Sequence, residues 1–270
     1  KVRAPNSSAP ARAPAHPPTI RELLSNSAGL VMWTPEERGA LDLHPLSRLV
    51  QFYAATELRF EPGAGYSYSN AGFNTAGRVI EIVSGMGYAD FVQKRLLDPL
   101  GMTDTTFWPD DAQLARLASA YKSGPDGLAR VEKIGLLNHP LGDRARRHAL
   151  PAGGLFSTAA DTARFGRLLL NKGVFDGKRI LSEAAVAEMT RRQTAEGAVR
   201  TPYGFGLNTV KGACWHGGAY GTELCFWPER NTVSVLMVQK DGRAWGSPAG
   251  EKIPQLLHQK ALELAQNTKN

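Results

Sequence analysis

The sequence predicts an α+β fold in which an antiparallel sheet is flanked by helices and joined to an all-helical lobe. In the first hundred residues apolar side chains recur every three or four positions, which indicates amphipathic helices. After Tyr203 the pattern changes to β-branched and glycine-rich runs separated by turn residues, which is typical of an antiparallel meander. The expected strands cover about 204–210, 212–217, 222–227 and 232–239.

Length and composition are those of a folded protein. The chain has 270 residues, of which 42% are hydrophobic and 21% charged, and this balance excludes disorder. The net charge of +7 is not concentrated, and the densest basic run, Arg144–His148, has no interleaved aromatic residues, so we expect a solvated face and no nucleic-acid partner. No stretch approaches the roughly 18 consecutive apolar residues of a membrane span, so none is expected.

The first ordered helix is predicted near residue 19. Residues 1–18 hold five prolines and almost no large apolar side chain, which favours an extended loop or linker. Thr19 and Glu22 then have the spacing of a capping box, and we expect the short helix that follows to end near Gly29.

Further elements follow from periodicity and caps. Residues 110–148 are irregular and polar, which predicts surface loops and a short helix, and Pro151–Gly154 predicts a tight turn. Helices are also expected after Thr158 and near Ser182. Three apolar patterns predict the other helices: Phe73, Ala76, Ile80 and Val83 closed by Gly85; Tyr88, Phe91, Val92 and Leu96 stopped before Pro99; and Ile253, Leu256, Leu257, Ala261 and Leu264.

Several kinds of site lack a motif. The six histidines never pair at ligand spacing and no Cys-x-x-Cys occurs, so no metal is expected. The phosphate-binding pattern G-x-x-x-x-G-K-[ST] is absent. Gly65-Tyr66-Ser67-Tyr68-Ser69 begins like a nucleophile elbow, but Ser69 stands where the second glycine is needed.

Two other motifs are more specific. Tyr68-Ser69-Asn70 precedes a predicted helix, and His216-Gly217-Gly218 ends a predicted strand. With their flanking segments they resemble the serine β-lactamase and penicillin-binding protein superfamily, and most closely its branch of class C β-lactamases, esterases and D-aminopeptidase-like peptidases. The resemblance runs from about Thr19 to Gln239, with the segments in the family's order. The flanking segments are Thr19–Leu24, Ser27–Leu30, Pro99–Met102, Pro151–Leu155 and His216–Gly221.

This resemblance implies a β-lactamase/transpeptidase-like domain over residues 19–270. Its helical lobe would cover about 19–150, and the C-terminal part of its α/β lobe about 151–270. The implied activity is that of a serine hydrolase, which forms an acyl-enzyme from a small-molecule ester, amide or peptide. The resemblance implies no cofactor, and it suggests a periplasmic or secreted location.

The resemblance also assigns roles to residues. In the family a lysine one helical turn after the nucleophilic serine shares a proton with the tyrosine of Tyr-x-Asn, which would be Tyr68. Asn70 would point into the same cleft, because residues two apart in an extended loop face the same way. His216 and Gly218 stand where most relatives have Lys-Thr-Gly, and the N–H of Ala219 would be the second oxyanion donor. A histidine offers no permanent charge to a substrate carboxylate, which favours esters or other amides over β-lactams.

The nucleophile itself is missing from the expected place. The sequence has one Ser-x-x-Lys, Ser119 to Lys122, which lies downstream of Tyr68 beside a turn, and we interpret it as a coincidence. Our hypothesis is that the N-terminal part of the domain, with its Ser-x-x-Lys helix, is lost, cleaved off or held in a separate chain. Two alternatives stay open: a catalytically silent module that binds cell-wall peptides, and an α/β-hydrolase that uses Ser67 or Ser69.

The two cysteines suggest a test of strand register. If the predicted hairpin turns about Ala219 and Tyr220, Cys214 and Cys225 are directly opposed, at a separation compatible with a disulfide. Two buried free thiols are the equally weighted alternative. A bridge would favour an extracytoplasmic location.

Overall fold

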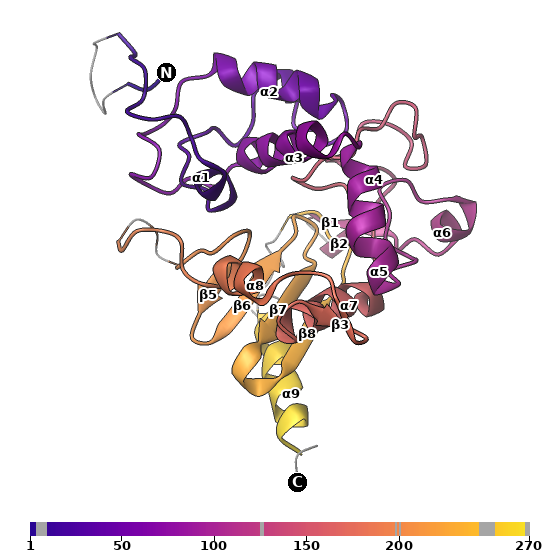
Figure 1. Ribbon diagram of the computed structural model, residues 1–270. Coiled ribbons are helices and arrows are strands. Elements are labelled where there is room, and N and C mark those ends of the chain that lie inside the picture. Colours follow the sequence, from indigo (N-terminus) through magenta and orange to yellow (C-terminus); the bar gives the residue numbers. More distant parts are fainter. Residues whose placement is uncertain (4–9, 125–126, 198, 200, 243–251, 268–270) are drawn as a thin grey trace.

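The computed structural model describes residues 1–3, 10–124, 127–197, 199, 201–242 and 252–267. Helices of the first hundred residues lie above a four-stranded sheet, and the two ends of the chain lie at opposite ends of the molecule (Figure 1). The helical elements are α1 (Ile20–Leu24), η1 (Pro35–Glu37), α2 (Leu46–Ala55), α3 (Asn70–Ser84), α4 (Tyr88–Val92), η2 (Gln93–Leu97), α5 (Asp98–Leu100), α6 (Asp111–Ala115), α7 (Ala159–Leu170), α8 (Glu183–Thr190), η3 (Pro228–Arg230) and α9 (Ile253–Asn267).

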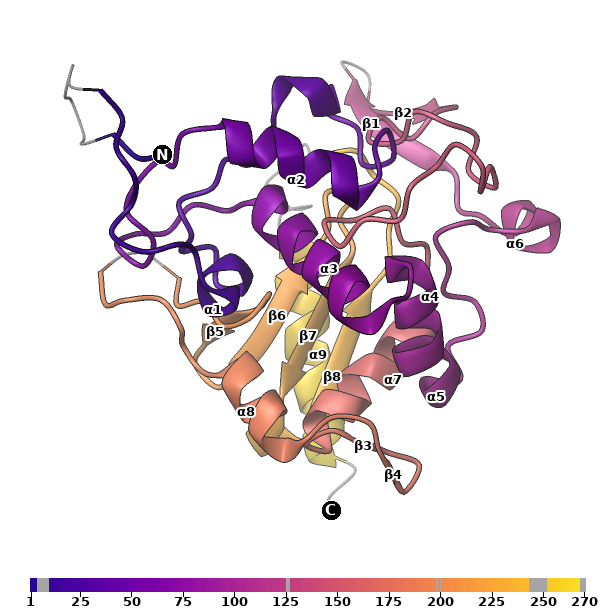
Figure 2. The same ribbon diagram turned by 45° about the horizontal axis from the view of Figure 1, so that its top comes forward.

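The main sheet is an antiparallel meander in the order β5-β6-β7-β8, as the sequence predicts. Helices α7 and α8 lie on one of its faces and α9 on the other (Figure 2). Two short hairpins, β1–β2 and β3–β4, lie outside it. The strands are β1 (Ala120–Gly124), β2 (Gly127–Val131), β3 (Val174–Phe175), β4 (Lys178–Arg179), β5 (Asn208–Val210), β6 (Ala213–Gly217), β7 (Glu223–Trp227) and β8 (Thr232–Leu236).

The core has three apolar clusters. One lies beneath α1, α2 and α3, a second joins η2 and α5 to α7, and a third fills the space between α7, α8 and the sheet. The first includes Val2, which is 3% exposed and pairs with Arg12 and Leu58, so the N-terminal segment is anchored in the core at this residue. Because the second cluster joins η2 and α5 to α7, the helical half of the chain is packed against the half that forms the sheet.

The predicted caps of the helices are present. Thr19 and Glu22 form the capping box of α1, although this helix ends at Leu24, before Gly29. Gly85 ends α3 in the left-handed conformation, and Thr158 and Ser182 cap α7 and α8.

The helix expected to stop before Pro99 continues past it to Leu100. A proline inside an α-helix removes one hydrogen bond and crowds the carbonyl four residues earlier. Here the preceding turn, η2, is a π-helix in which the N–H of Asp98 donates to the carbonyl of Gln93, five residues earlier. The wider turn accommodates the proline, and the helix ends at Gly101 instead.

The expectation that Arg144–His148 forms a solvated face is wrong for Arg147. This side chain is 2% exposed and forms a buried ion pair with Asp42, between Nε and Oδ2 at 3.4 Å. It also donates hydrogen bonds to the carbonyls of Phe107, Leu141 and Gly154. Its neighbour Arg144 is exposed, so the run divides between the interior and the surface.

The expected pairing of Cys214 with Cys225 is also wrong. The turn is a five-residue loop, 218–222, and the register pairs Cys214 with Phe226 and Trp215 with Cys225. Because a shift of one residue moves a side chain to the other face of a sheet, the two cysteines lie on opposite faces. Both are buried free thiols.

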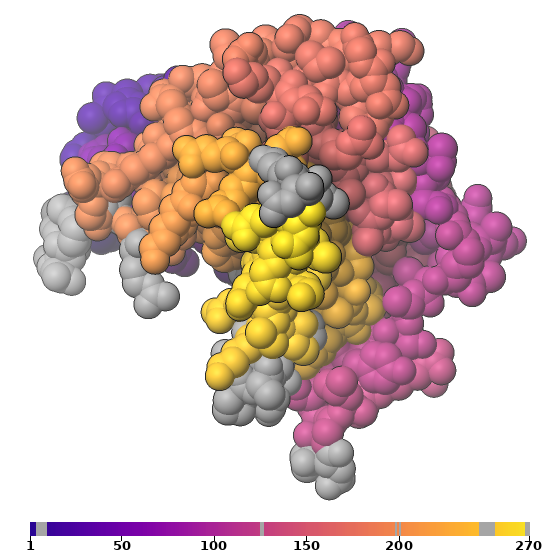
Figure 3. Space-filling model, turned by 90° about the horizontal axis from the view of Figure 1, so that it is seen from below, coloured from indigo at the N-terminus to yellow at the C-terminus, as the bar shows by residue number. Residues whose placement is uncertain are grey.

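Helix α9 runs along the surface of the molecule when it is seen from below (Figure 3). None of its described residues is buried. His258 connects it to the sheet: Nε2 contacts Glu223 Oε1 at 2.6 Å and Nδ1 contacts Ser234 Oγ at 3.2 Å. The edge of the His258 ring also packs on Trp227 of β7, at 5.3 Å between ring centroids. Within the described ranges no helix is long and apolar enough to cross a bilayer.

Candidate active site

Tyr68 lies in the loop that leads into α3, and its side chain is 38% exposed. The next residue, Ser69, is the N-cap of α3: its Oγ accepts a hydrogen bond from the N–H of Gly72 at 3.0 Å and donates to the carbonyl of Val31 at 2.8 Å. The loop is therefore fixed at the start of the helix, with the phenol of Tyr68 at the surface.

The structure brings Tyr68 and His216 together from distant parts of the chain. Their rings are stacked, with centroids 6.2 Å apart and planes inclined by 25°. His216 lies on β6 and is half-buried. One wall of this site therefore comes from the helical half and the other from the sheet, in the arrangement that the two sequence motifs predict.

Asn70 is the first residue of α3 and is 6% exposed. The expectation that it faces the same way as Tyr68 assumes an extended backbone, but the extended conformation ends at Ser69. A buried Asn70 beside an exposed Tyr68 does not follow the alternation of a strand, so the role of Asn70 in the cleft stays a prediction.

Gly218 and Ala219 lie in the loop that follows His216. The N–H of Gly218 donates to the carbonyl of Thr222 at 2.7 Å, and the N–H of Gly221 donates to the carbonyl of Gly218 at 3.1 Å. A Cβ on Gly218 would lie 2.3 Å from Thr222 Oγ1, so a larger residue here would require the Thr222 side chain to move. Ala219 is exposed at the tip, and its use as an oxyanion donor stays a prediction.

Tyr220 anchors this loop from below. It is 8% exposed, and its hydroxyl accepts a hydrogen bond from the N–H of Gly135 at 2.7 Å. Its carbonyl accepts another from the N–H of Lys240 at 3.0 Å. Burial raises the pKa of the Tyr220 phenol. The tip of the loop is thus held on a neutral, buried support.

A buried group that the sequence analysis missed lies behind Tyr68, formed by Tyr66, Tyr203 and Asn26. The rings of Tyr66 and Tyr203 meet edge to face at 5.5 Å. Burial raises the pKa of both phenols, and the neighbouring Tyr68 raises it further. Asn26 and Tyr203 are each 1% exposed. Tyr66 lies beside the Tyr68 motif and Asn26 beside the Ser27–Leu30 segment, but no local pattern indicates this group, because its contacts come from distant segments.

The serines that the sequence offers as nucleophiles have contacts that do not support this role. Ser119 and Lys122 flank the start of strand β1 and Lys122 is exposed, so they do not form a helical pair. Ser67 Oγ accepts a hydrogen bond from Arg59 at 3.3 Å, and Ser69 is 2% exposed and occupied as a helix cap. These contacts and the antiparallel sheet do not favour the α/β-hydrolase alternative.

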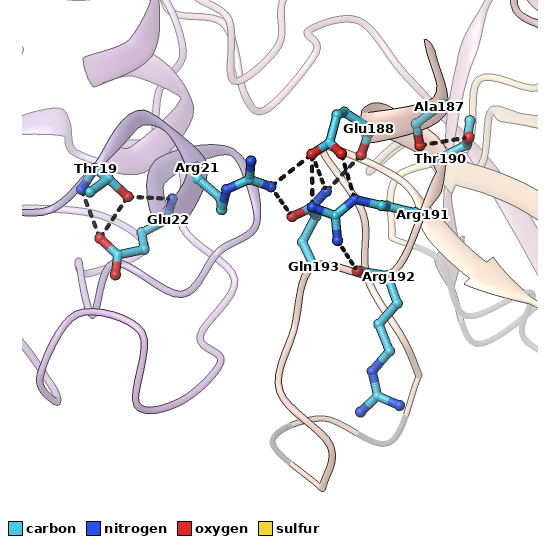
Figure 4. Close-up of polar contacts among 9 residues, drawn as sticks. All are labelled: Thr19, Arg21, Glu22, Ala187, Glu188, Thr190, Arg191, Arg192 and Gln193. Atoms are coloured by element: carbon cyan, nitrogen blue, oxygen red, sulfur yellow. Dashed lines mark hydrogen bonds and ion pairs between the residues drawn. The ribbon is translucent and has the colours of Figure 1, made fainter. Parts of the chain in front are cut away.

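A polar network joins the two halves beside this region (Figure 4). Arg21 of α1 donates to Glu188 of α8 at 2.9 Å and also to the side chain of Gln193. Arg191 donates to the same carboxylate at 2.7 and 2.8 Å. The two arginines lower the pKa of Glu188 to about 2, with the Arg191 hydrogen bond as the larger cause. The N–H of Gln193 donates to the carbonyl of Tyr203 at 2.8 Å, which links the network to the tyrosine group.

The described residues contain no group of three or more His, Cys, Asp or Glu side chains that could hold a metal ion. The site presents a phenol stacked on an imidazole, beside the loop that holds Gly218 and the exposed residue Ala219. Phenol and imidazole groups can transfer protons, and a loop N–H can stabilise an oxyanion.

Comparisons with known proteins identify relatives of this chain. Penicillin-binding protein 4 of Amycolatopsis lactamdurans is 32% identical over 186 residues, which cover 68% of this chain and 46% of that protein. Lovastatin esterase of Penicillium rubens is 35% identical over 191 residues, which cover 65% and 44%. The chain thus spans about half the length of the curated relatives it matches.

Solved structures show the same fold. Simvastatin synthase from Aspergillus terreus has a TM-score of 0.73 at 18% identity, over 99% of this chain and 73% of that one. The hydrolase EstCE1 has a TM-score of 0.69 at 24% identity, over 83% and 67%. A sequence model described as Beta-lactamase matches residues 4–253. The chain therefore belongs to the β-lactamase family of serine hydrolases and related penicillin-binding proteins.

Proposed function

We propose that this chain supplies part of a serine hydrolase site that cleaves an ester or amide through an acyl-enzyme, with its nucleophile provided by polypeptide outside these 270 residues. The observation that carries the proposal is the stacking of Tyr68 on His216. The names of similar proteins support it, because they include an esterase, a penicillin-binding protein and D-alanyl-D-alanine carboxypeptidases.

In the proposed reaction a serine hydroxyl attacks the substrate carbonyl while Tyr68 accepts the serine proton. The proton then passes to the leaving alcohol or amine, and the C–O or C–N bond breaks to leave an acyl-serine. Water then attacks the acyl-serine ester and gives its proton to Tyr68, and Tyr68 passes this proton to the serine oxygen as the C–O bond breaks and the acid is released. A phenol serves as base near neutral pH only beside a cation, which the lysine of the external Ser-x-x-Lys would provide.

His216 makes esters and neutral amides the favoured substrates. An imidazole is mostly neutral at pH 7 and can donate one hydrogen bond, whereas a lysine would attract a substrate carboxylate. Ala219 is exposed at the tip of the loop 218–222, and its N–H is the proposed second donor to the oxyanion.

Labelling the purified protein with a fluorophosphonate tests this proposal, with intact mass and N-terminal sequencing of the labelled species. We expect an adduct on a serine outside the 270 residues. Tyr68→Phe should slow adduct formation by about 100-fold or more, as loss of a general base does. Tyr121→Phe is the matched control, because Tyr121 is equally exposed, at 38%, and lies on β1.

A silent binding module is the second candidate, favoured by the position of the sole Ser-x-x-Lys on an exposed strand. It predicts reversible binding of a fluorescent penicillin or a cell-wall peptide. Binding without any adduct, in a sample whose mass includes polypeptide beyond these 270 residues, would establish the module and overturn the hydrolase.

A further inference from the structure

Asn26 holds the backbone on both sides of Tyr68. Its carbonyl accepts a hydrogen bond from the N–H of Ser67 at 2.9 Å, and its side-chain Oδ1 accepts one from the N–H of Ser69, also at 2.9 Å. Asn26 is 1% exposed and adopts the left-handed conformation, with φ 59°. One buried residue therefore holds the N–H groups of the two residues on either side of Tyr68.

The orientation of the Asn26 amide follows from these contacts. Because Oδ1 accepts from a backbone N–H, Nδ2 is on the other branch of the side chain, beside the phenols of Tyr66 and Tyr203. Both Nδ2 and the Tyr203 hydroxyl are buried, and Nδ2 lies close enough to the two phenols to act on them as a hydrogen-bond donor.

The amide also influences the phenols electrostatically. Burial raises the pKa of Tyr66 and of Tyr203, and the Asn26 side chain opposes this by lowering both values. The charge of ionised Tyr68 is felt by both phenols. Asn26 is therefore placed to favour negative charge among the side chains of Tyr66, Tyr68 and Tyr203.

We propose that Asn26 is the positioning residue of Tyr68: its carbonyl and Oδ1 hold the phenol against the His216 ring, and its Nδ2 faces the two phenols behind it. The catalytic meaning of this placement rests on the proposed function, but the placement itself does not. Without the Asn26 side chain the Ser69 N–H loses its acceptor, and the loop that carries Tyr68 is free to move away from His216.

Two variants separate the role of the Asn26 backbone from that of its side chain, and a third variant is the control. Asn26→Gly retains the carbonyl and tolerates the left-handed backbone, but removes the amide. Asn26→Asp retains an oxygen acceptor for Ser69 and also tolerates this backbone, but removes the Nδ2 donor. Asn74→Ala is the control, because Asn74 is fully buried and its side chain bonds to other partners: it accepts from the N–H of Ala152 at 3.1 Å and donates to the Tyr53 hydroxyl at 2.9 Å.

The readout is the NMR signal of the His216 imidazole, whose chemical shift depends on the stacked Tyr68 ring, with Tyr68→Phe and Tyr68→Ala as references. Ultraviolet titration of tyrosine ionisation is measured in parallel. We expect Asn26→Gly to move the His216 signal toward that of Tyr68→Ala. Asn26→Asp should leave the His216 signal close to that of the parent protein, while shifting tyrosine ionisation to higher pH because a carboxylate replaces the amide donor.

In the labelling assay Asn26→Gly should slow adduct formation by about 100-fold, as a displacement of about 1 Å can. A parent-like His216 signal in Asn26→Gly would overturn the proposal, as would an equal change in Asn74→Ala. If Asn26→Gly does not fold, loss of the stacked signal in folded Asn26→Asp would overturn it as well. If the sample includes polypeptide beyond these 270 residues, an unlabelled parent protein with the expected NMR changes would refute the hydrolase and leave the positioning role intact.

Discussion

The buried ion pair between Arg147 and Asp42 yields the strongest stability prediction. Arg147 is 2% exposed and Asp42 is fully buried. The carboxylate of Asp42 also accepts hydrogen bonds from the N–H groups of Asn138 and His139, at 2.8 and 3.1 Å. The pair therefore ties the segment before the Pro151 turn to the loop that follows η1.

Arg147→Ala removes one partner of this pair and leaves the other charge buried. It also leaves three carbonyl groups without the guanidinium that they accept from. Breaking a buried ion pair in this way costs about 3–5 kcal/mol of unfolding free energy. Since a domain is stable by only about 5–15 kcal/mol, the loss should be large enough to measure without ambiguity.

Urea unfolding followed by tryptophan fluorescence measures this loss. The control is Arg144→Ala, because Arg144 is in the same basic run but is 70% exposed and pairs with Asp90 at 3.4 Å on the surface. An exposed pair contributes about 0–1 kcal/mol. Equal midpoints for the two variants would refute the assignment of Arg147 to the interior.

Three further predictions concern other parts of the molecule. Two arginines lower the pKa of Glu188 from 4.5 to about 2, so its stabilising effect is complete above pH 4.5 and is lost as the pH falls toward 2. Glu188→Gln should therefore flatten the pH dependence of acid unfolding in this window, and an unchanged curve would contradict the network. Burial raises the pKa of Cys214 to about 11 and of Cys225 to about 12, so both thiols should react slowly with a thiol reagent in the native protein. Both should titrate in denaturant without reductant, and finding no free thiol would contradict the register of β6 with β7. Gly77→Ala would place a Cβ 2.3 Å from Pro151 Cγ. Calorimetry should show a loss of about 1–3 kcal/mol of unfolding free energy, and an unchanged stability would contradict this close packing.

Local patterns predicted much of the fold. The apolar spacing that ends at Gly85 indicates α3, and the capping residue Ser182 indicates the start of α8, because both signals depend only on residues within a few positions. The meander was predicted in the right order for the same reason. The hairpin β1–β2 was missed, because its residues are almost all exposed and show no alternation.

Contacts between distant segments could not be predicted in this way. The burial of Arg147 depends on Asp42, and the register of β6 with β7 depends on the conformation of the loop around Tyr220. Of the candidate site, the motifs identified Tyr68 and His216, which the structure places together. Asn26 was missed, because its importance comes from accepting the N–H groups of residues some forty positions away.

The exposed packing of helix α9 affects how the protein unfolds locally. It has no buried residue among those described, and His258 bonds it to the sheet. Segments with few buried apolar contacts unfold locally at a lower free energy than the core. The amides of α9 should therefore exchange with solvent while the strand β7 beneath it is still protected, which makes this terminal helix a separate cooperative unit rather than part of the global unfolding transition.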